Sequence, residues 1–422
     1  MERIYSLRRF FIAILCMLPL FGFGKDKTVN IMIHNPYDYA LKDAPVVVDL
    51  HDLPMIDFKI RGVVVFDGER VCPCQLDDID SDGTNDELCF LYDLSSKSRK
   101  QITIEFSEIV SKDDYPNRLY SDILLNDKKG NHPLILRLEA PGSSNIFNDL
   151  YHHGVAFESE ITAYRIYFDH RQNIDLYGKR MRRLELSSTG FYTTAEQMSS
   201  GYGNDVLWAG NSIGCGSLKL WDGSSPKNWT DLSVRGQRIC SCGPVRSVVE
   251  LTDRGVNIGG ELYDIKSIYT QYAGHRDVCV DVYLDKPIKN PILCTGVQKI
   301  GASSDAYSYN GGIKDEGFIR GGLAASWGSD YPEMGKKDVF PPEAVGLAVK
   351  VDSEYLVSSK TDDLNYLLVI GNPGQQHIRY HISFCAAKEN DGYHSASEWF
   401  KSLYEWRTEG IDYLIINNYF TI

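Results

Sequence analysis

Residues 151–180 carry the densest set of chemically capable side chains in this 422-residue chain. Their sequence, YHHGVAFESEITAYRIYFDHRQNIDLYGKR, combines adjacent histidines, two alternating carboxylates, several tyrosines and several arginines. Histidine, glutamate and tyrosine side chains can transfer protons, and arginine can neutralise a developing anion. The stretch therefore predicts a site for acid–base chemistry, in which the candidate catalytic residues are His153, Glu158, Glu160, Tyr164 and Arg165.

The element expected to position these side chains is a single β-strand over residues 155–169, which are rich in β-branched and aromatic residues and lack Gly and Pro. Side chains alternate between the two faces of a strand. Glu158 and Glu160 would then project side by side, with Tyr164 on the same face and Arg165 on the other. A solvated strand face without chemistry is the alternative for the two glutamates, and a hydrogen-bonded structural role is the alternative for His153.

Further candidates lie outside this strand. His275 and Arg276 sit in a Gly-containing turn, AGHRD, between two strand-like runs, and they join the catalytic candidates. A long irregular loop follows the central stretch, and such loops in compact domains are often functional. Aromatic and cationic side chains in or near it suit sugar binding, so the candidate substrate-binding residues are Tyr167, Arg171, Tyr177, Tyr202 and Trp208.

The sequence DIDSDGTNDEL at residues 78–88 follows the first nine positions of an EF-hand-like calcium loop. Gly83 suits the sharp turn, but Cys89 replaces the usual bidentate glutamate, and strands rather than helices flank the loop. We therefore predict a structural calcium-binding loop, with a plain acidic turn as the alternative; the candidate ligands are Asp78, Asp80, Asp82 and Asp86. No organic cofactor is expected, because neither a phosphate loop nor a dinucleotide fingerprint is present.

Residues 1–24 are typical of a signal peptide. Three arginines precede an apolar run at residues 10–23, and Gly22 and Gly24 form a small-residue cleavage pattern. Cleavage near Gly24 would leave Lys25 as the mature N-terminus. The sequence thus predicts a periplasmic or extracellular protein.

The same segment argues against membrane anchoring. The apolar run is short for a membrane span, so no membrane insertion is expected. Leu15 stands before Cys16 where a lipoprotein signal would have a small residue, so lipidation is not expected either. The formal net charge of −13 makes nucleic acid an unfavourable partner.

Strand-like runs separated by Pro, Gly, Asp or Ser recur along the whole chain, which predicts an all-β fold with few short helices. Short helices are expected after Thr193, with Glu196 completing a capping box, and after Ser395, which Glu398 would complement. We expect four parts: a signal peptide (1–24), a small N-terminal β-sandwich (25–110), a linker with short strands (111–150), and a large antiparallel β-supersandwich domain with a closing C-terminal helix (151–422).

Several segments together resemble a family of secreted bacterial proteins that carry a domain of unknown function. These segments include NPYDYALKDAPVVVDL, QLDDIDSDGTNDELCF, STGFYTTAEQMSSGYGNDVLWAG and YAGHRDVCVDV. Genes of this family are typically found in polysaccharide-degradation loci, so the resemblance implies a carbohydrate-active protein. The layout of the chain also resembles the mutarotase-like β-supersandwich of many lyases and hydrolases that act on sugars.

Three functions fit these residues, each with a polysaccharide or oligosaccharide as partner. The favoured one is β-elimination on uronate-containing, pectin-like glycans. An arginine would neutralise the uronate, His153 or His275 would act as base, and Tyr164 or Tyr177 as acid. The alternatives are a glycoside hydrolase that uses Glu158 and Glu160, and a non-catalytic glycan-binding protein. The sequence leaves the oligomeric state open.

Overall fold

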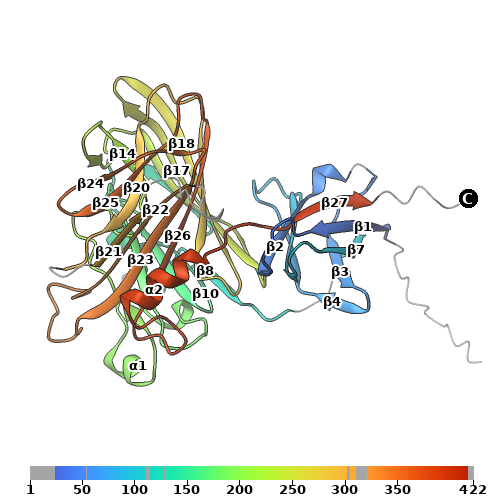
Figure 1. The fold of residues 1–422 in the computed structure, drawn as a ribbon, viewed down its shortest axis with the longest axis horizontal. Helices are drawn as coiled ribbons and strands as arrows, with labels where there is room; N and C mark the ends of the chain where they lie inside the picture. Colours follow the sequence, from blue (N-terminus) through green and yellow to red (C-terminus); the bar gives the residue numbers. More distant parts are fainter. Residues whose placement is uncertain are drawn as a thin grey trace, which may run out of the picture.

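The computed structural model describes residues 24–53, 55–110, 115–127, 129–301, 305–309 and 321–416. The signal peptide expected at residues 1–24 therefore lies outside the described residues, apart from Gly24. Within them, the chain is almost entirely β-structure with two short α-helices, which confirms the predicted all-β fold. In Figure 1, a small sandwich stands beside a larger set of sheets, and the segment after α2 crosses from one to the other.

The small sandwich consists of two sheets that enclose a core of their own. The first has the strand order β27-β1-β7-β3-β4, with β1 (Asp26–His34), β3 (Gly62–Asp67), β4 (Arg70–Cys72), β7 (Arg99–Ser107) and β27 (Asp412–Ile416). The second has the order β2-β6-β5, with β2 (Leu41–Asp49), β5 (Cys74–Asp77) and β6 (Glu87–Leu94). The 3-10 helix η1 (Leu50–Asp52) follows β2. The sequence placed residues 412–416 in the large domain, but β27 pairs with β1 and completes the small sandwich.

The larger part contains a nine-stranded antiparallel sheet of order β21-β22-β23-β26-β19-β18-β17-β16-β9. Its strands are β9 (Arg137–Pro141), β16 (Val234–Cys242), β17 (Arg246–Ile258), β18 (Glu261–Tyr272), β19 (Val278–Leu284), β21 (Asp305–Tyr309), β22 (Gly321–Asp330), β23 (Glu343–Asp352) and β26 (His377–Ala386).

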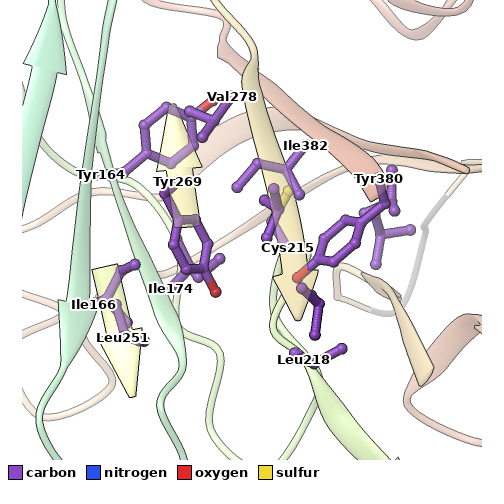
Figure 2. Packing of buried hydrophobic residues seen from close by; sticks show 14 of the residues in the cluster. Tyr164, Ile166, Ile174, Cys215, Leu218, Leu251, Tyr269, Val278, Tyr380 and Ile382 are labelled. Atoms are coloured by element: carbon purple, nitrogen blue, oxygen red, sulfur yellow. The ribbon is translucent and has the colours of Figure 1, made fainter. Parts of the chain in front are cut away.

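Two five-stranded sheets pack against the inner face of this sheet. One contains β8 (Leu119–Asp122), β10 (Gly154–Ser159), β11 (Thr162–Tyr167), β12 (Ile174–Gly178) and β13 (Asn204–Asp205). The other contains β14 (Lys219–Trp221), β15 (Pro226–Lys227), β20 (Leu293–Gln298), β24 (Leu356–Thr361) and β25 (Asn365–Ile370). Figure 2 shows Tyr164, Tyr269 and Tyr380 among aliphatic side chains in the shared core. Residues 119–122 and 137–141, expected in a linker with short strands, supply β8 and β9 to these sheets.

The alternation of side chains along β19 and β26 leaves a polar outer face. Val278, Val280 and Val282 of β19 point into the core, as do Ile378, Tyr380 and Ile382 of β26. The intervening residues form cross-strand pairs, which we call the polar strip: Cys279 with His381, Asp281 with Arg379, and Tyr283 with His377.

The predicted single strand at residues 155–169 is wrong, because β10 and β11 form a hairpin with Glu160 and Ile161 in its turn. The Ser159 hydroxyl accepts a hydrogen bond from the Ile161 amide at 3.1 Å, so the turn forms without Gly or Pro. In the hairpin register Glu158 faces Ala163, and Ala156 faces Arg165. Glu158 and Arg165 therefore share a face of the sheet, whereas the single strand would have separated them.

The α-helices are short, as predicted. In α1 (Ala195–Ser199) the capping box consists of Thr194 and Gln197, one residue later than the predicted Thr193 and Glu196. In α2 (Ala396–Tyr404) the Ser395 side chain accepts from the Glu398 amide, as predicted, and Trp399 and Leu403 are buried. Two more 3-10 helices, η2 (Phe147–Asp149) and η3 (Leu186–Ser188), lie beside the β10–β11 hairpin.

A buried polar junction fastens the small sandwich to the large sheet at the start of β17. Arg246 donates to Asp77 at 2.6 Å and to Glu87 at 2.5 Å. The Gln75 side chain accepts from the Val245 and Arg246 amides and donates to the Arg246 carbonyl at 3.1 Å. Because Gln75, Asp77 and Arg246 are all buried, each depends on the others to satisfy its polar atoms.

We predict that Arg246→Ala destabilises the protein by about 3–5 kcal/mol, because it leaves the Asp77 carboxylate buried without its cation. Urea-induced unfolding measures the effect. The matched control is Arg254→Ala, which removes a half-exposed pair with Glu139 and should cost at most about 1 kcal/mol. Equal effects of the two substitutions would contradict the assigned role of Arg246.

Candidate functional site

Glu158, a candidate catalytic carboxylate, is fully buried and serves the fold. Lys179 forms an ion pair with it at 2.5 Å, and the backbone amides of Glu185 and Leu186 donate to it at 2.8 Å. Burial raises the pKa of Glu158, whereas Lys179 and the two amides oppose the rise. The side chain thereby anchors the loop that follows β12 onto the sheet.

Arg165 and Tyr177 belong to the same buried polar layer on the outer face of β11 and β12, and the partly buried His153, just before β10, lies beside it. Arg165 donates to Asp175 at 2.6 Å and lies 4.0 Å from the centre of the Phe191 ring. The His153 ring stacks on the Phe191 ring, with the two ring centroids 3.9 Å apart. Burial lowers the pKa of His153 to about 4. The Tyr177 hydroxyl donates to Glu185 at 2.8 Å. Arg165 and Tyr177 thus pair with buried carboxylates of Asp175 and Glu185, whereas the His153 side chain makes only ring contacts among the described residues.

Of the remaining substrate-binding candidates, Tyr167 packs against His153 and Phe191, with its ring centroid 5.2 Å from that of the former and 5.9 Å from that of the latter. Arg171 pairs with Asp169 and lies 5.6 Å from the Tyr167 ring. Tyr202 lies beneath Arg183 at 4.0 Å, and Trp208 is 47 % exposed in the loop before β14. The structure does not bring these residues together around one cavity.

The β10–β11 hairpin contacts the turn between β18 and β19, which carries the other predicted catalytic residues, His275 and Arg276. The Tyr164 hydroxyl donates to the Arg276 carbonyl at 2.7 Å, and Glu160 accepts from the Gly274 amide at 3.1 Å. Glu160 also pairs with Arg118, and the Arg276 side chain pairs with Glu389 at 2.7 Å. The predicted residues are therefore neighbours here, but their contacts hold the turn in place.

His275 in this turn reaches across to the small sandwich. Its Nδ1 lies 3.3 Å from an Asp277 carboxylate oxygen, and its Nε2 lies 2.7 Å from the Asp43 carbonyl oxygen. Both neighbours are acceptors, so the geometry favours a ring that donates from both nitrogens, which is the imidazolium form. Burial would lower the pKa of His275, but Asp277 and Asp43 together raise it above its ordinary value.

A cavity of about 570 Å³, which we call the cleft, opens between the small sandwich and the outer face of the nine-stranded sheet. Two other cavities described in the chain measure about 280 and 20 Å³. The small sandwich contributes one wall with Tyr37, Pro45, Val47, Ile79 and Glu87, and residues 407–412 line a second side. The sheet contributes most of the floor, including His275 and most of the polar strip.

The floor of the cleft combines an exposed cation with an aromatic surface. Arg379 donates to Asp281 at 2.8 and 3.0 Å, and His377 lies 2.6 Å from the same carboxylate. Burial would raise the pKa of Asp281, but these two partners hold it below its ordinary value. The Arg379 side chain is still 45 % exposed, and Tyr283, stacked on His377, is 39 % exposed. Both can meet a ligand in the cleft.

Sequence reasoning included His275 among its candidates but missed Asp281, Tyr283, Arg379 and His381. The signal was present in VCVDVYL and HIRYHISF, where polar side chains alternate with core residues. Each strand alone offers few chemical groups. Only the register between β19 and β26 brings them together.

A family model described as "Domain of unknown function (DUF4861)" matches residues 33–410. No curated protein matches the chain.

Two solved structures from Enterococcus faecalis share a similar arrangement. One, titled as a protein in glycosyl hydrolase family 38, is 8% identical with a TM-score of 0.46, covering 93% of this chain and 48% of that one. The other, an alpha-mannosidase from strain V583, is 8% identical with a TM-score of 0.44, covering 93% and 46%. The chain thus spans about half the length of each. A likeness at this level says nothing about activity.

The acidic loop between β5 and β6 brings together three of its four predicted metal ligands. Carboxylate oxygens of Asp78, Asp80 and Asp86 all lie within 4.8 Å of one another. The Asp82 carboxylate is not part of this group and accepts from the Thr84 amide at 2.7 Å. Clustered carboxylates suit calcium. We keep calcium as a proposal for this loop, with Asp78, Asp80 and Asp86 as ligands.

We predict that calcium raises the melting temperature of the wild type, since a ligand that binds only the folded state adds about 2.7 kcal/mol at one hundred times its Kd. Differential scanning calorimetry with and without calcium measures the shift. Asp80→Ala should lose most of it, whereas the control Asp82→Ala should keep most of it. A wild type that does not respond to calcium would end this proposal.

Proposed function

Because the chain belongs to the family of the domain of unknown function DUF4861, whose description names no activity, we propose its function from the cleft. We propose that the protein is carbohydrate-active and cleaves uronate-containing, pectin-like glycans by β-elimination. The observation that carries this proposal is the meeting of an exposed arginine, an exposed tyrosine and two histidines in one cavity of about 570 Å³. A volume of this size suits a ligand of several hundred daltons.

Arg379 is the group best placed to bind the uronate carboxylate. Asp281 occupies its Nε and Nη2 atoms, while its Nη1 makes no hydrogen bond within the described part of the chain. A guanidinium N–H donates a strong, charge-assisted bond to a carboxylate. Neutralising that carboxylate makes the neighbouring C5 proton more acidic, which is the main requirement of β-elimination.

Aromatic groups in the cleft supply a surface for the sugar ring. Tyr283 of the polar strip is partly exposed at the floor, and Tyr272 lines the same cavity. Tyr37 faces them from the small sandwich. An aromatic ring offers a sugar a large apolar contact with a polar edge. The two sides of the cleft would therefore share the glycan.

The hydrolase alternative loses support from the positions of its two carboxylates. Glu158 is sealed beneath the loop after β12 with Lys179, and Glu160 is held by Arg118 and the Gly274 amide. A glycosidase needs both carboxyl groups to reach one glycosidic bond. An assay of the reaction product distinguishes non-catalytic glycan binding from β-elimination.

We also propose that residues 1–24 direct export and are removed, so that the protein works in the periplasm or outside the cell. In the described part of the chain, no helix has the length and apolar character needed to cross a bilayer. Intact-mass measurement of the protein from a periplasmic fraction should give a chain that begins at Lys25. A mass that still includes residues 1–24 would refute export by cleavage.

We predict that incubation with a uronate-rich glycan releases an unsaturated product that absorbs in the near ultraviolet. Arg379→Ala should lower kcat/KM at least about a hundredfold, as expected when a donor to the developing anion is lost. The control Arg254→Ala, an exposed arginine outside the cleft, should leave the rate unchanged.

New reducing ends without this absorbance would replace β-elimination with hydrolysis. Retention of the glycan on a column, with neither signal, would make the protein a non-catalytic glycan-binding protein.

A further inference from the structure

Two histidines line the cleft, and they differ in whether a ring nitrogen can take up a proton. Both nitrogens of His275 face acceptors, the Asp277 carboxylate and the Asp43 carbonyl, which favours the fully protonated ring. It can hold the small sandwich in place, but it has no lone pair for a base. The sequence assigned the role of base to His275 or His153. Because His153 does not line the cleft, a base in this cavity must be another residue.

His381 meets this requirement. It lies on the outer face of β26, between Cys279 of β19 and Lys350 of β23 in the sheet register. Its side chain lines the cleft and makes no hydrogen bond within the described part of the chain. A neutral imidazole without a partner keeps a lone pair that can accept a proton.

We propose that His381 is the catalytic base of the cleft, which removes the C5 proton of a uronate whose carboxylate is bound by Arg379. The inference rests on the proposed function and names the residue that would perform its chemical step. Arg379 and His381 are two residues apart on one strand, so their side chains leave the same face roughly 6.6 Å apart. That spacing lets one bind the carboxylate while the other reaches the hydrogen on the adjacent carbon.

The step is balanced within the substrate and His381. The imidazole takes the C5 proton, the electron pair of the C5–H bond forms the C4–C5 double bond, and the C4–O bond breaks. The departing glycosidic oxygen then receives the proton from the imidazolium. No oxidant, reductant or water is consumed, and the base returns to its starting form.

The groups that face His381 explain how it can serve as a base. Burial above all lowers its pKa to about 4; Lys350 and Arg379 act in the same direction, whereas Asp277 and Asp281 oppose them. The ring is therefore neutral at neutral pH and ready to accept a proton. A bound uronate adds a negative charge beside Arg379, which removes part of the cationic influence and makes the imidazole more basic.

Asp277 is fixed as a carboxylate next to this ring. It accepts from His275 and from the Trp406 indole N–H at 3.0 Å. Burial would raise its pKa, but His275 above all lowers it to about 2. A permanent negative charge at this point stabilises the imidazolium that forms when His381 takes the proton. His275 thus contributes as a positioning residue.

The test compares His381→Gln with the wild type on a uronate-rich glycan, by the near-ultraviolet absorbance of the unsaturated product. We expect kcat to fall at least about a hundredfold with little change in KM, as for loss of a general base. The control His51→Gln changes an exposed histidine outside the cleft and should keep the wild-type rate. Because the His381 side chain makes no hydrogen bond to any residue that the structure describes, His381→Gln should keep a melting temperature close to wild type.

The pH dependence of the wild type gives a second readout that needs no variant. On the acid side, kcat/KM should fall as His381 of the free enzyme becomes protonated, with a midpoint near pH 4. A merely structural histidine would not produce this limb, and the residual activity of His381→Gln should lack it.

Three results would overturn the inference. Near-normal turnover by folded His381→Gln would refute His381 as base while leaving β-elimination intact. An acid limb that persists unchanged in His381→Gln would do the same. A wild type that forms no unsaturated product from pectic or other uronate glycans would overturn the proposed function together with this inference.

Discussion

The ion pair between buried Arg246 and Asp77 is the contact on which the architecture of the cleft depends. Neither wall of the cavity forms a pocket by itself, because the polar strip lies on a sheet face and Tyr37 lies on the small sandwich. Arg246 joins the two with Gln75 and Glu87, and His275 adds a second link through the Asp43 carbonyl. Unpaired groups at this junction would be costly, so the two parts have a defined position.

Much of the fold could be predicted because its information is local. Runs such as VCVDVYL alternate core and outer residues within one strand, and the Ser395 cap of α2 needs only neighbouring residues. The β10–β11 hairpin could not be read in this way. Its turn is formed by the Ser159 hydroxyl, in a stretch whose composition is that of one continuous strand. The pairing of β27 with β1 was also beyond local patterns, since these strands come from opposite ends of the described chain.

The candidate site was harder to predict than the fold, for a physical reason. The central stretch is dense in polar groups, but one face of its sheet is covered by the loop after β12, so Glu158 and Arg165 must find partners inside the protein. The charged groups are dense there because each buried charge is paired with another one inside the protein. The cleft distributes its groups over several elements, and Arg379 and His381 become neighbours of Asp277 and Tyr283 only after the sheet has formed. His275 was identified because its turn is conspicuous in the sequence.

The pairing of β27 with β1 also has a consequence for the order of folding. Asn30 lies opposite Ile416 in this pairing, so the contact joins segments separated by almost the whole described chain. Closing so long a loop is entropically costly, and contacts of this kind slow folding. Until the ribosome has released residues 412–416, β1 has an unpaired edge of the kind that recruits strands from other molecules. The edge of β1 is therefore open to such pairing during synthesis, and the first strand of the described chain is completed by its last.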